Sequence, residues 1–411
     1  MKVTLATEMA PPFTLVAHFF IAAIIFLLLS TSVLPFLADT INGYFITPTL
    51  AAFSHLYLLG FVMMVIFGAM YQLLPVVLEA PIFSKDFAYV QFYMYCVGLC
   101  LMVGGFSVST WHLLIPYGSV ITYLSMLIFC INVFLTFYRL ESITLVGKFL
   151  LVATVFLFLS VSIGLVIGLS LGHGLFSIDI DAWVRAHIVG TLGGFVMMVI
   201  MGVAMVLLPM FSLAHGYSQK WIENAFYFQS LGVIGTIASL ISGYEKIAMP
   251  FVGSIIFACI LFVIQMVLIL KSRVRKQNDY WVKNSVFALF WFTCSLIALW
   301  YNFFLGGMLF FLGFLLPLIV GHIYKILPFL IWYEKFSPLV GKQKVPLLHQ
   351  MIHTKVADIQ TWMLFIALSF LSASVMFVSK IVFVVGGIIL FVSIGFVVYN
   401  VVYTFTYKHK E

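Results

Sequence analysis

Long apolar stretches separated by short polar breaks run along the whole chain. A helix crosses a bilayer with about 20 apolar residues, and twelve stretches reach that length. They lie at about 13–37, 46–78, 88–108, 113–137, 147–172, 186–212, 221–243, 249–270, 282–303, 306–333, 358–379 and 381–406. Charged residues such as Asp39, Lys85, Arg139 and Asp179 stand in the breaks. The pattern predicts an all-α polytopic membrane protein with 12 transmembrane helices.

The composition leads to the same class. Of the 411 residues, 64% are hydrophobic and 8% are charged, against roughly 25% charged in soluble domains. The mean hydropathy is +1.20. A soluble globule, a disordered chain, a disulfide scaffold and a nucleic-acid binder are therefore excluded, and the lipid bilayer is the expected surrounding. The five cysteines all fall inside apolar runs, so we expect buried thiols rather than disulfides.

The basic residues predict an orientation. Of the 20 Lys and Arg residues, sixteen fall on the side of the N-terminus, Lys325 falls within a span, and three fall on the opposite side: Arg185, Lys246 and Lys380. Cytoplasmic loops are enriched in Lys and Arg. We therefore expect both termini in the cytoplasm of a bacterial cell, with the chain in its inner membrane. The net charge of +7 is then explained by the basic cytoplasmic loops and does not indicate an acidic partner.

One sequence frame occurs three times. The frame consists of Gly-Phe, a second Gly eight residues after the first, and a Pro seven residues after the second Gly. It begins at Gly60, Gly194 and Gly313. The offsets are 134 and 119 residues, or four predicted helices each time. A transporter of this length that is built from two halves would repeat after about six helices. The frame predicts a single membrane domain, 1–411, of three pseudo-repeated four-helix units at approximately 1–140, 141–275 and 276–411. Close helix packing alone would explain the glycines and prolines.

Histidines gather at the outer ends of the predicted helices. His55 lies 20 residues before the proline of its repeat and His187 lies 22 before its own, so their depths differ by about 3 Å. Met308 lies 20 residues before the proline of the third repeat, which is the position that His55 has in the first. His112 and His173 fall on the same side. Ionisable groups in membranes often mark sites, so His55, His187, His173 and His112 are candidate metal ligands. The alternative is a set of interfacial histidines bonded to backbone or water.

His322 lies deeper in the third repeat, 14 residues from the level of His55. That is about 21 Å along a helix, so the two cannot ligate one iron. We expect His322, Tyr324 and Tyr71 to form an inner polar patch or proton path. The alternative is that His322 is a hydrogen-bonded histidine of the core. Lys325 follows and is expected to snorkel inward.

Helices 2 and 6 carry a family resemblance. His55-x4-Gly60-Phe61-x6-Gly68-x6-Pro75 resembles the first histidine helix of NnrS-type haem-copper membrane proteins, and Gly68–Pro75 also resembles nitric-oxide reductase large subunits. His187-Ile-Val-Gly-Thr-Leu-Gly-Gly is similar to a second NnrS-type helix. The resemblance is to the haem-copper oxidase superfamily. Its architecture covers the chain, but its motifs cover only helices 2 and 6 and the frame of helix 10.

The resemblance implies a b-type haem, with copper as a second candidate metal. His55 would be an axial haem ligand, His187 a second haem or copper ligand, and Met308 a sixth ligand, since His/Met pairs are a known haem arrangement. Arg185 and Lys380 would pair with haem propionates. The family's two histidines on helix 10 and its pair near helix 7 are missing here. A complete oxygen-reducing binuclear centre is therefore not expected.

The sequence thus favours a haem-binding inner-membrane protein in nitric-oxide or respiratory-stress metabolism, or in electron or metal handling. Oxidoreductase chemistry stays open, and the expected partner is a small redox protein or a respiratory complex. The alternative is a transporter or respiratory-complex assembly factor that reuses the fold without haem. A small-molecule or metal permease, with His55, His187 and His173 as its relay, is a further alternative.

Overall fold

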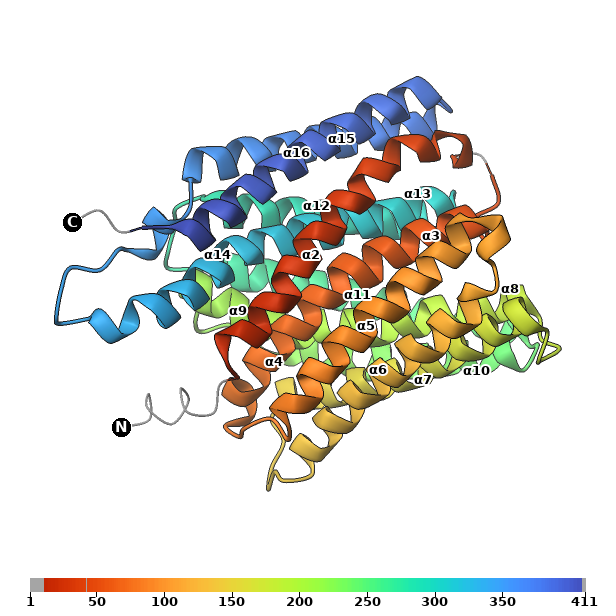
Figure 1. Cartoon of the computed structure of the whole chain (residues 1–411), viewed down its shortest axis with the longest axis horizontal. Coiled ribbons are helices and arrows are strands. Elements are labelled where there is room, and N and C mark those ends of the chain that lie inside the picture. Colours follow the sequence, from red (N-terminus) through yellow and green to blue (C-terminus); the bar gives the residue numbers. More distant parts are fainter. Residues whose placement is uncertain (1–10, 42, 409–411) are drawn as a thin grey trace. The chain divides into compact units, whose positions relative to one another are not determined.

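The computed structural model describes residues 11–41 and 43–408. Within these residues the protein is helical throughout, with no strand (Figure 1). Twelve helical stretches are long and apolar enough to cross a membrane. This confirms the predicted number of spans and the class of multi-pass membrane protein.

Nine spans contain a single α-helix, and in the first that helix runs on into a 3₁₀ turn. The helices are α2 (Phe13–Val33, then the turn Leu34–Thr40), α5 (Lys85–Ser107), α6 (Leu114–Phe137), α7 (Leu145–His173), α10 (Lys220–Ile241), α11 (Glu245–Lys271), α12 (Tyr280–Ala298), α15 (Thr354–Met376) and α16 (Lys380–Thr406). Short 3₁₀ turns lie between spans at Ser109–Trp111, Ser337–Leu339 and Leu348–Met351.

The second, sixth and tenth spans each contain a wider turn. Span 2 consists of α3 (Pro48–Tyr57), a π-helical segment (Leu58–Met63) and α4 (Met64–Leu78). Span 6 consists of α8 (Ile180–Ile188), a π-helical segment (Val189–Val196) and α9 (Met197–Ser212). Span 10 consists of α13 (Phe303–Met308), a π-helical segment (Leu309–Leu315) and α14 (Leu316–Lys335). π-helical segments are rare and occur often at functional sites.

Each π-helical segment holds the first glycine of the repeated frame. A Cβ atom on Gly60 would lie 2.7 Å from Phe26 Cβ, one on Gly194 2.7 Å from Phe156 Cβ, and one on Gly313 2.8 Å from Trp291 Cβ. A side chain at these positions would therefore push the preceding helix away. The glycines are where two backbones approach closely.

The second glycine of the frame makes a related contact in two of these spans. A Cβ on Gly202 would lie 2.8 Å from Phe149 Cβ, and one on Gly321 2.9 Å from Asn284 Cβ. Phe149 is seven residues before the contact of Gly194, and Asn284 is seven before that of Gly313. Glycines eight apart thus match neighbours seven apart on an antiparallel helix, close to two helical turns in each.

The prolines of the frame lie within the helices and do not end them. Pro75, Pro209 and Pro328 are inside α4, α9 and α14. α14 continues for seven residues beyond its proline, to Lys335. Asp179 also differs from its predicted role as a break, because its side chain accepts hydrogen bonds from the N–H groups of Asp181 and Ala182 and begins α8 there. Span 6 therefore starts at Ile180 and not near 186.

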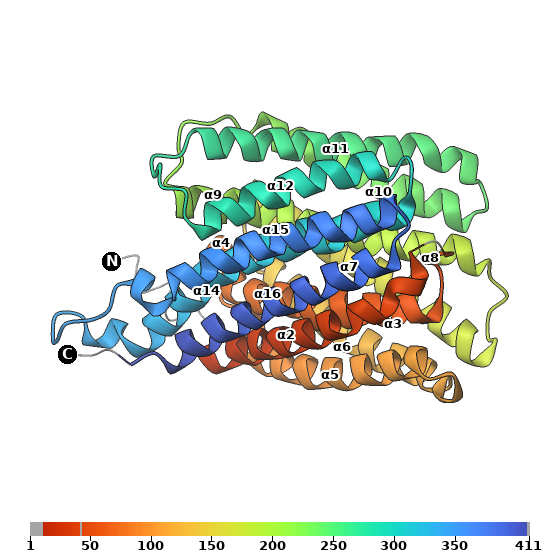
Figure 2. The same cartoon turned by 90° about the horizontal axis from the view of Figure 1, so that it is seen from above.

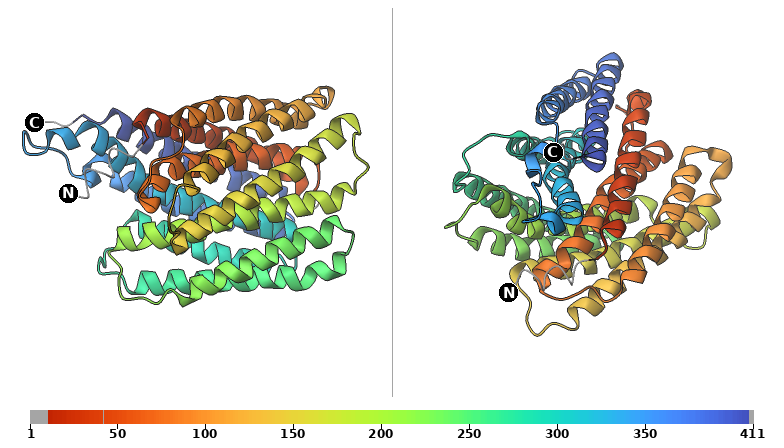
Figure 3. Two further views of the ribbon diagram at one scale, coloured as in Figure 1. Left: turned by 90° about the horizontal axis from the view of Figure 1, so that it is seen from below. Right: turned by 60° about the vertical axis from the view of Figure 1, so that its left-hand side comes forward.

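The chain divides into two compact units. The first comprises residues 1–16 and 66–276, and the second comprises 17–65 and 277–411. In the first, α10 and α11 lie side by side as an antiparallel pair (Figure 3). In the second, α15 and α16 form another such pair (Figure 2).

Candidate functional site

His55 lies on α3, three residues before the π-helical segment of span 2. Its Nδ1 is 2.7 Å from the carbonyl oxygen of Ala51, one turn earlier. A carbonyl only accepts, so Nδ1 carries the proton and Nε2 is the basic nitrogen of the neutral ring. The ring is part-buried. This is the orientation in which a backbone carbonyl commonly holds a metal-binding histidine.

Tyr57 shows which side of α3 meets span 10. Its hydroxyl donates to the carbonyl of Phe311 at 2.8 Å, and the two rings stack with centroids 5.9 Å apart. Tyr57 is fully buried. His55 lies two residues earlier, which is about 200° around the helix. It therefore points away from the side that faces span 10.

Met308 is the last residue of α13 and is buried, with 8% of its surface exposed. It belongs to the span that Tyr57 contacts, three residues before Phe311. Because His55 points away from that span, the geometry does not support a His55–Met308 axial pair. The pair stays a prediction.

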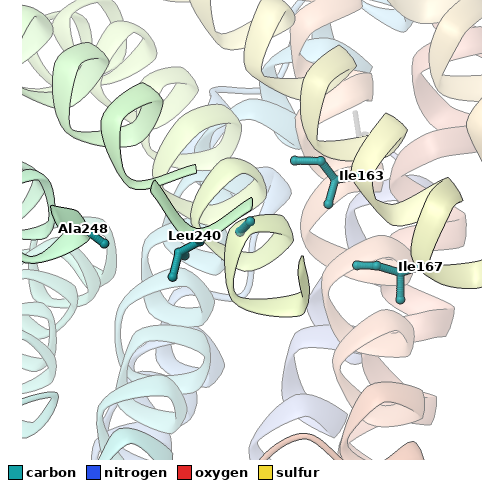
Figure 4. Close-up of a cluster of buried hydrophobic side chains, with 5 residues drawn as sticks. Ile163, Ile167, Leu240 and Ala248 are labelled. Atoms are coloured by element: carbon teal, nitrogen blue, oxygen red, sulfur yellow. The ribbon is translucent and has the colours of Figure 1, made fainter. Parts of the chain in front are cut away.

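His187 is packed onto α7. Its Nδ1 is 2.8 Å from the carbonyl oxygen of Ser160, and a Cβ on Gly164 would lie 2.8 Å from its Cε1. The preceding residue, Ala186, is part of a buried apolar cluster with Ile163, Ile167, Leu240 and Ala248 (Figure 4). Relative to the first glycine of the frame, His187 lies seven residues before and His55 five. This offset of two residues, about 200° around a helix, means that the two histidines do not occupy the same face of their spans in the repeated frame.

The other two outer histidines have separate surroundings. The ring of His173, at the end of α7, lies edge-on to Tyr117 with centroids 6.0 Å apart. His112 has its Nδ1 3.2 Å from the carbonyl oxygen of Ser109 and is exposed. His173 is nine residues beyond Gly164, about 13 Å along the helix, so it does not share a ligand sphere with His187. Among the described residues, no three or more His, Cys, Asp or Glu are grouped to hold a metal ion.

Both predicted propionate partners carry an ion pair. Arg185 Nη2 lies 2.5 Å from Glu245 Oε1, and Lys380 Nζ lies 2.6 Å from Asp39 Oδ1. Their side chains are 35% and 64% exposed, and exposed ion pairs of this kind are weak. Either cation could exchange its carboxylate for another anion at small cost.

The inner half of span 10 is polar. His322 Nδ1 is 2.7 Å from the Leu318 carbonyl, and its ring lies edge-on to Trp281 at 6.0 Å. Lys325 Nζ pairs with Asp279 Oδ2 at 2.7 Å, and both side chains are largely buried. The predicted snorkelling lysine thus has a carboxylate partner inside the protein, and the Asp279 side chain also caps α12.

Tyr71 and Tyr324, predicted with His322 as one inner polar patch, belong to two separate buried polar networks whose other members were not predicted. In the first unit, the Tyr71 hydroxyl donates to Gln91 Oε1 at 3.0 Å and Ser125 Oγ donates to the Gln91 carbonyl at 2.8 Å. Asn132 lies seven residues after Ser125 and bonds both backbone groups of Ser84, at 2.9 and 2.8 Å. We call these residues the α4–α5–α6 network.

The second unit holds a similar set. The Tyr324 hydroxyl donates to Gln360 Oε1 at 3.4 Å, and Gln360 Nε2 donates to Ser393 Oγ at 3.2 Å. Asn400, seven residues after Ser393, accepts from the backbone N–H of His353 at 3.0 Å. We call these the α14–α15–α16 network. Both tyrosines stand four residues before the repeated proline, and both Asn begin an Asn-Val-x-x-Thr sequence. That shared spacing was the available signal.

The corresponding part of span 6 lacks the tyrosine. Met205 stands four residues before Pro209. Gln229 of α10 and Gln265 of α11 are both fully buried. Gln229 Nε2 donates to the Gly193 carbonyl at 2.7 Å, inside the π-helical segment. Within the described part of the chain, its Oε1 and both amide atoms of Gln265 have no hydrogen-bond partner.

Comparison with protein-family models and with curated protein sequences finds no match for this chain.

Proposed function

We propose that this chain is a haem-binding membrane protein of the haem-copper oxidase type, with His55 as the axial ligand and without a complete binuclear centre. The observation that carries the proposal is the ring of His55, which a carbonyl one turn earlier holds with Nε2 as its basic nitrogen. The resemblance of this helix to the first histidine helix of NnrS-type proteins supports it.

The proposed architecture is three pseudo-repeated four-helix units. Its support is local geometry that recurs. Three spans carry a π-helical segment around the first glycine of the frame, and each glycine faces a large side chain of the preceding span. Two of the proposed units also hold the same tyrosine–glutamine–serine–asparagine network.

In this proposal a haem would be held from one side. His55 would supply its axial nitrogen, and Met308, the predicted sixth ligand, lies on the span from which His55 points away. Haem with one protein ligand supplies a coordination position for a small diatomic molecule, as nitric-oxide handling requires. Copper has less support, because the ring of His187 is packed on Gly164, where an added Cβ would lie 2.8 Å from its Cε1 and 3.5 Å from its Nε2.

The membrane and orientation belong to the same proposal. We place the chain in a bacterial inner membrane with both termini in the cytoplasm, because sixteen Lys and Arg fall on the side of the N-terminus and three on the other. A small redox protein or a respiratory complex is the proposed partner.

An absorption spectrum of the purified full-length protein tests the proposal. We expect a Soret band with visible bands that change on reduction. His55→Ala should remove or shift that band because iron loses a directed nitrogen ligand. His322→Ala is the matched control and should leave the spectrum unchanged, because it lies about 21 Å deeper by helix rise. Equal effects of both substitutions would contradict the assignment of His55 as the axial ligand.

The second candidate function is a transporter or respiratory-complex assembly factor without haem. The observation that favours it is the pairing of Arg185 and Lys380 with carboxylates of the same chain. Colourless protein after expression with ample haem would select this alternative.

A further inference from the structure

A shallow apolar groove lies along α15 and α16. It has a volume of about 420 Å³ and is lined by Val356 of α15 and by Phe391, Val392, Gly395, Phe396 and Tyr399 of α16. These two helices run side by side in opposite directions (Figure 2). The groove follows α16 for eight residues, about 12 Å.

The groove faces outward from its unit. Val392 is 45% exposed and Tyr399 is 50% exposed. Between them stands Gly395, where an added Cβ would meet nothing within 4 Å. The missing side chain makes the hollow, and no close backbone contact requires a glycine there. A surface of this kind on a membrane span meets lipid chains or another helix.

One end of the groove is basic. Val356 belongs to the first turn of α15, directly after the exposed Lys355. The nearby carboxylate of Asp358 is paired with Lys283 at 2.8 Å. Lys355 itself has no carboxylate partner among the described residues. The local charge at this end is therefore positive.

The basic end is held in place. The backbone N–H of His353 donates to Asn400 Oδ1 at 3.0 Å, which fixes the start of α15 against α16. The His353 ring lies 6.1 Å from the rings of Tyr399 and Tyr403. An aromatic rim with a cation at the end of an apolar groove matches the interface of a bilayer, where amphipathic rings and lysines lie at headgroup level.

We propose that this groove binds an anionic phospholipid, with one acyl chain along Gly395 and the headgroup phosphate beside Lys355. Charge complementarity selects this occupant over the helix of a partner protein, because a spanning helix would not require the cation at the end of the groove. Anionic lipids gain binding energy from each Lys near the surface.

The test measures lipid bound to the intact full-length protein by mass spectrometry, after purification with equal amounts of phosphatidylglycerol and phosphatidylcholine. We expect the unaltered protein to retain phosphatidylglycerol. Lys355→Gln should weaken its binding about fivefold, the factor for one Lys at a membrane surface, and leave phosphatidylcholine unchanged. Gly395→Leu should weaken the binding of both lipids, because it fills the groove.

Matched controls make the result specific. Gly253→Leu fills another site on a spanning helix where an added Cβ meets nothing within 4 Å, and Lys342→Gln removes another exposed lysine; neither should change lipid binding. Photo-crosslinking from a phosphatidylglycerol acyl chain to residues 391–399 of the unaltered protein gives a readout that does not depend on variant folding. Equal effects of Gly253→Leu and Gly395→Leu, or crosslinks elsewhere only, would overturn the proposal. So would a Gly395→Leu protein that loses a co-purifying protein but keeps its lipid.

Discussion

The α4–α5–α6 network and the α14–α15–α16 network use the same residue types in the same order. In each, a tyrosine near the repeated proline bonds a buried glutamine, a serine of the last helix contacts that glutamine, and an asparagine seven residues later holds the start of the middle helix. They differ in how the asparagine is used. Asn132 makes two bonds to Ser84, whereas Asn400 makes one to His353. Among the described residues, each network leaves one buried amide nitrogen without a hydrogen-bond partner: Gln91 Nε2 in the first and Asn400 Nδ2 in the second.

The difference shows what such networks do in a membrane protein. A buried polar group without a partner costs free energy because no water reaches it. Pairing with backbone groups lets a spanning helix carry asparagine and still fix the position of its neighbours. In span 6, where Met205 takes the place of the tyrosine, both amide atoms of the buried Gln265 on α11 have no hydrogen-bond partner among the described residues.

The largest expected effect is at the asparagines. Asn132→Ala removes two hydrogen bonds to the backbone at the start of α5, and we expect it to lower the free energy of unfolding by about 2 kcal/mol. Asn400→Ala removes one such bond and should cost about half as much. Denaturation of both variants in the same mixed micelles measures the difference. Equal losses would show that the number of backbone bonds does not set the cost.

A smaller effect is expected from adding the tyrosine that span 6 lacks. Met205→Tyr should be more stable than Met205→Phe by about 1 kcal/mol, because only the hydroxyl can pair with the unpartnered amide of Gln265, which lies on a helix that contacts α9. The comparison of the two rings removes the effect of their size. Thermal unfolding in detergent measures it, and identical melting temperatures would mean that Met205 does not occupy the tyrosine position of the other two networks.

The smallest effect should separate the two tyrosines. Tyr71→Phe loses a 3.0 Å bond to Gln91, and we expect a cost of about 0.6 kcal/mol, the average for side-chain hydrogen bonds measured between membrane helices. Tyr324→Phe loses a 3.4 Å bond to Gln360 and should cost less. Unfolding in mixed micelles gives both values. A larger loss at Tyr324 would reverse the ranking of the networks.

The spans were predictable from the sequence because apolar length alone decides them. The start of span 6 was not, since Asp179 looks like a break and acts as a cap. The depths of His55 and His187 stay predictions, made by counting residues before a proline. Their directions were not predictable, because two residues of offset turn a side chain to the opposite face. The networks join residues 20 to 48 apart, or 33 to 47 apart, on separate helices. Their only signal in the sequence is the spacing that the two sets share, which does not say which residues bond.

The π-helical segments have a consequence for how this chain can change in evolution. Each wide turn accommodates one residue more than an α-helix of the same rise, so a single-residue deletion there can be absorbed without breaking the span. Such a deletion within Val189–Val196 would return the turn to α-helical geometry and leave the outer part of the span in register, with His187 still beside Ser160. Single-residue length differences between related chains should therefore cluster in these three turns, inside the membrane, and leave unchanged the outer side chains that each span presents to its neighbours.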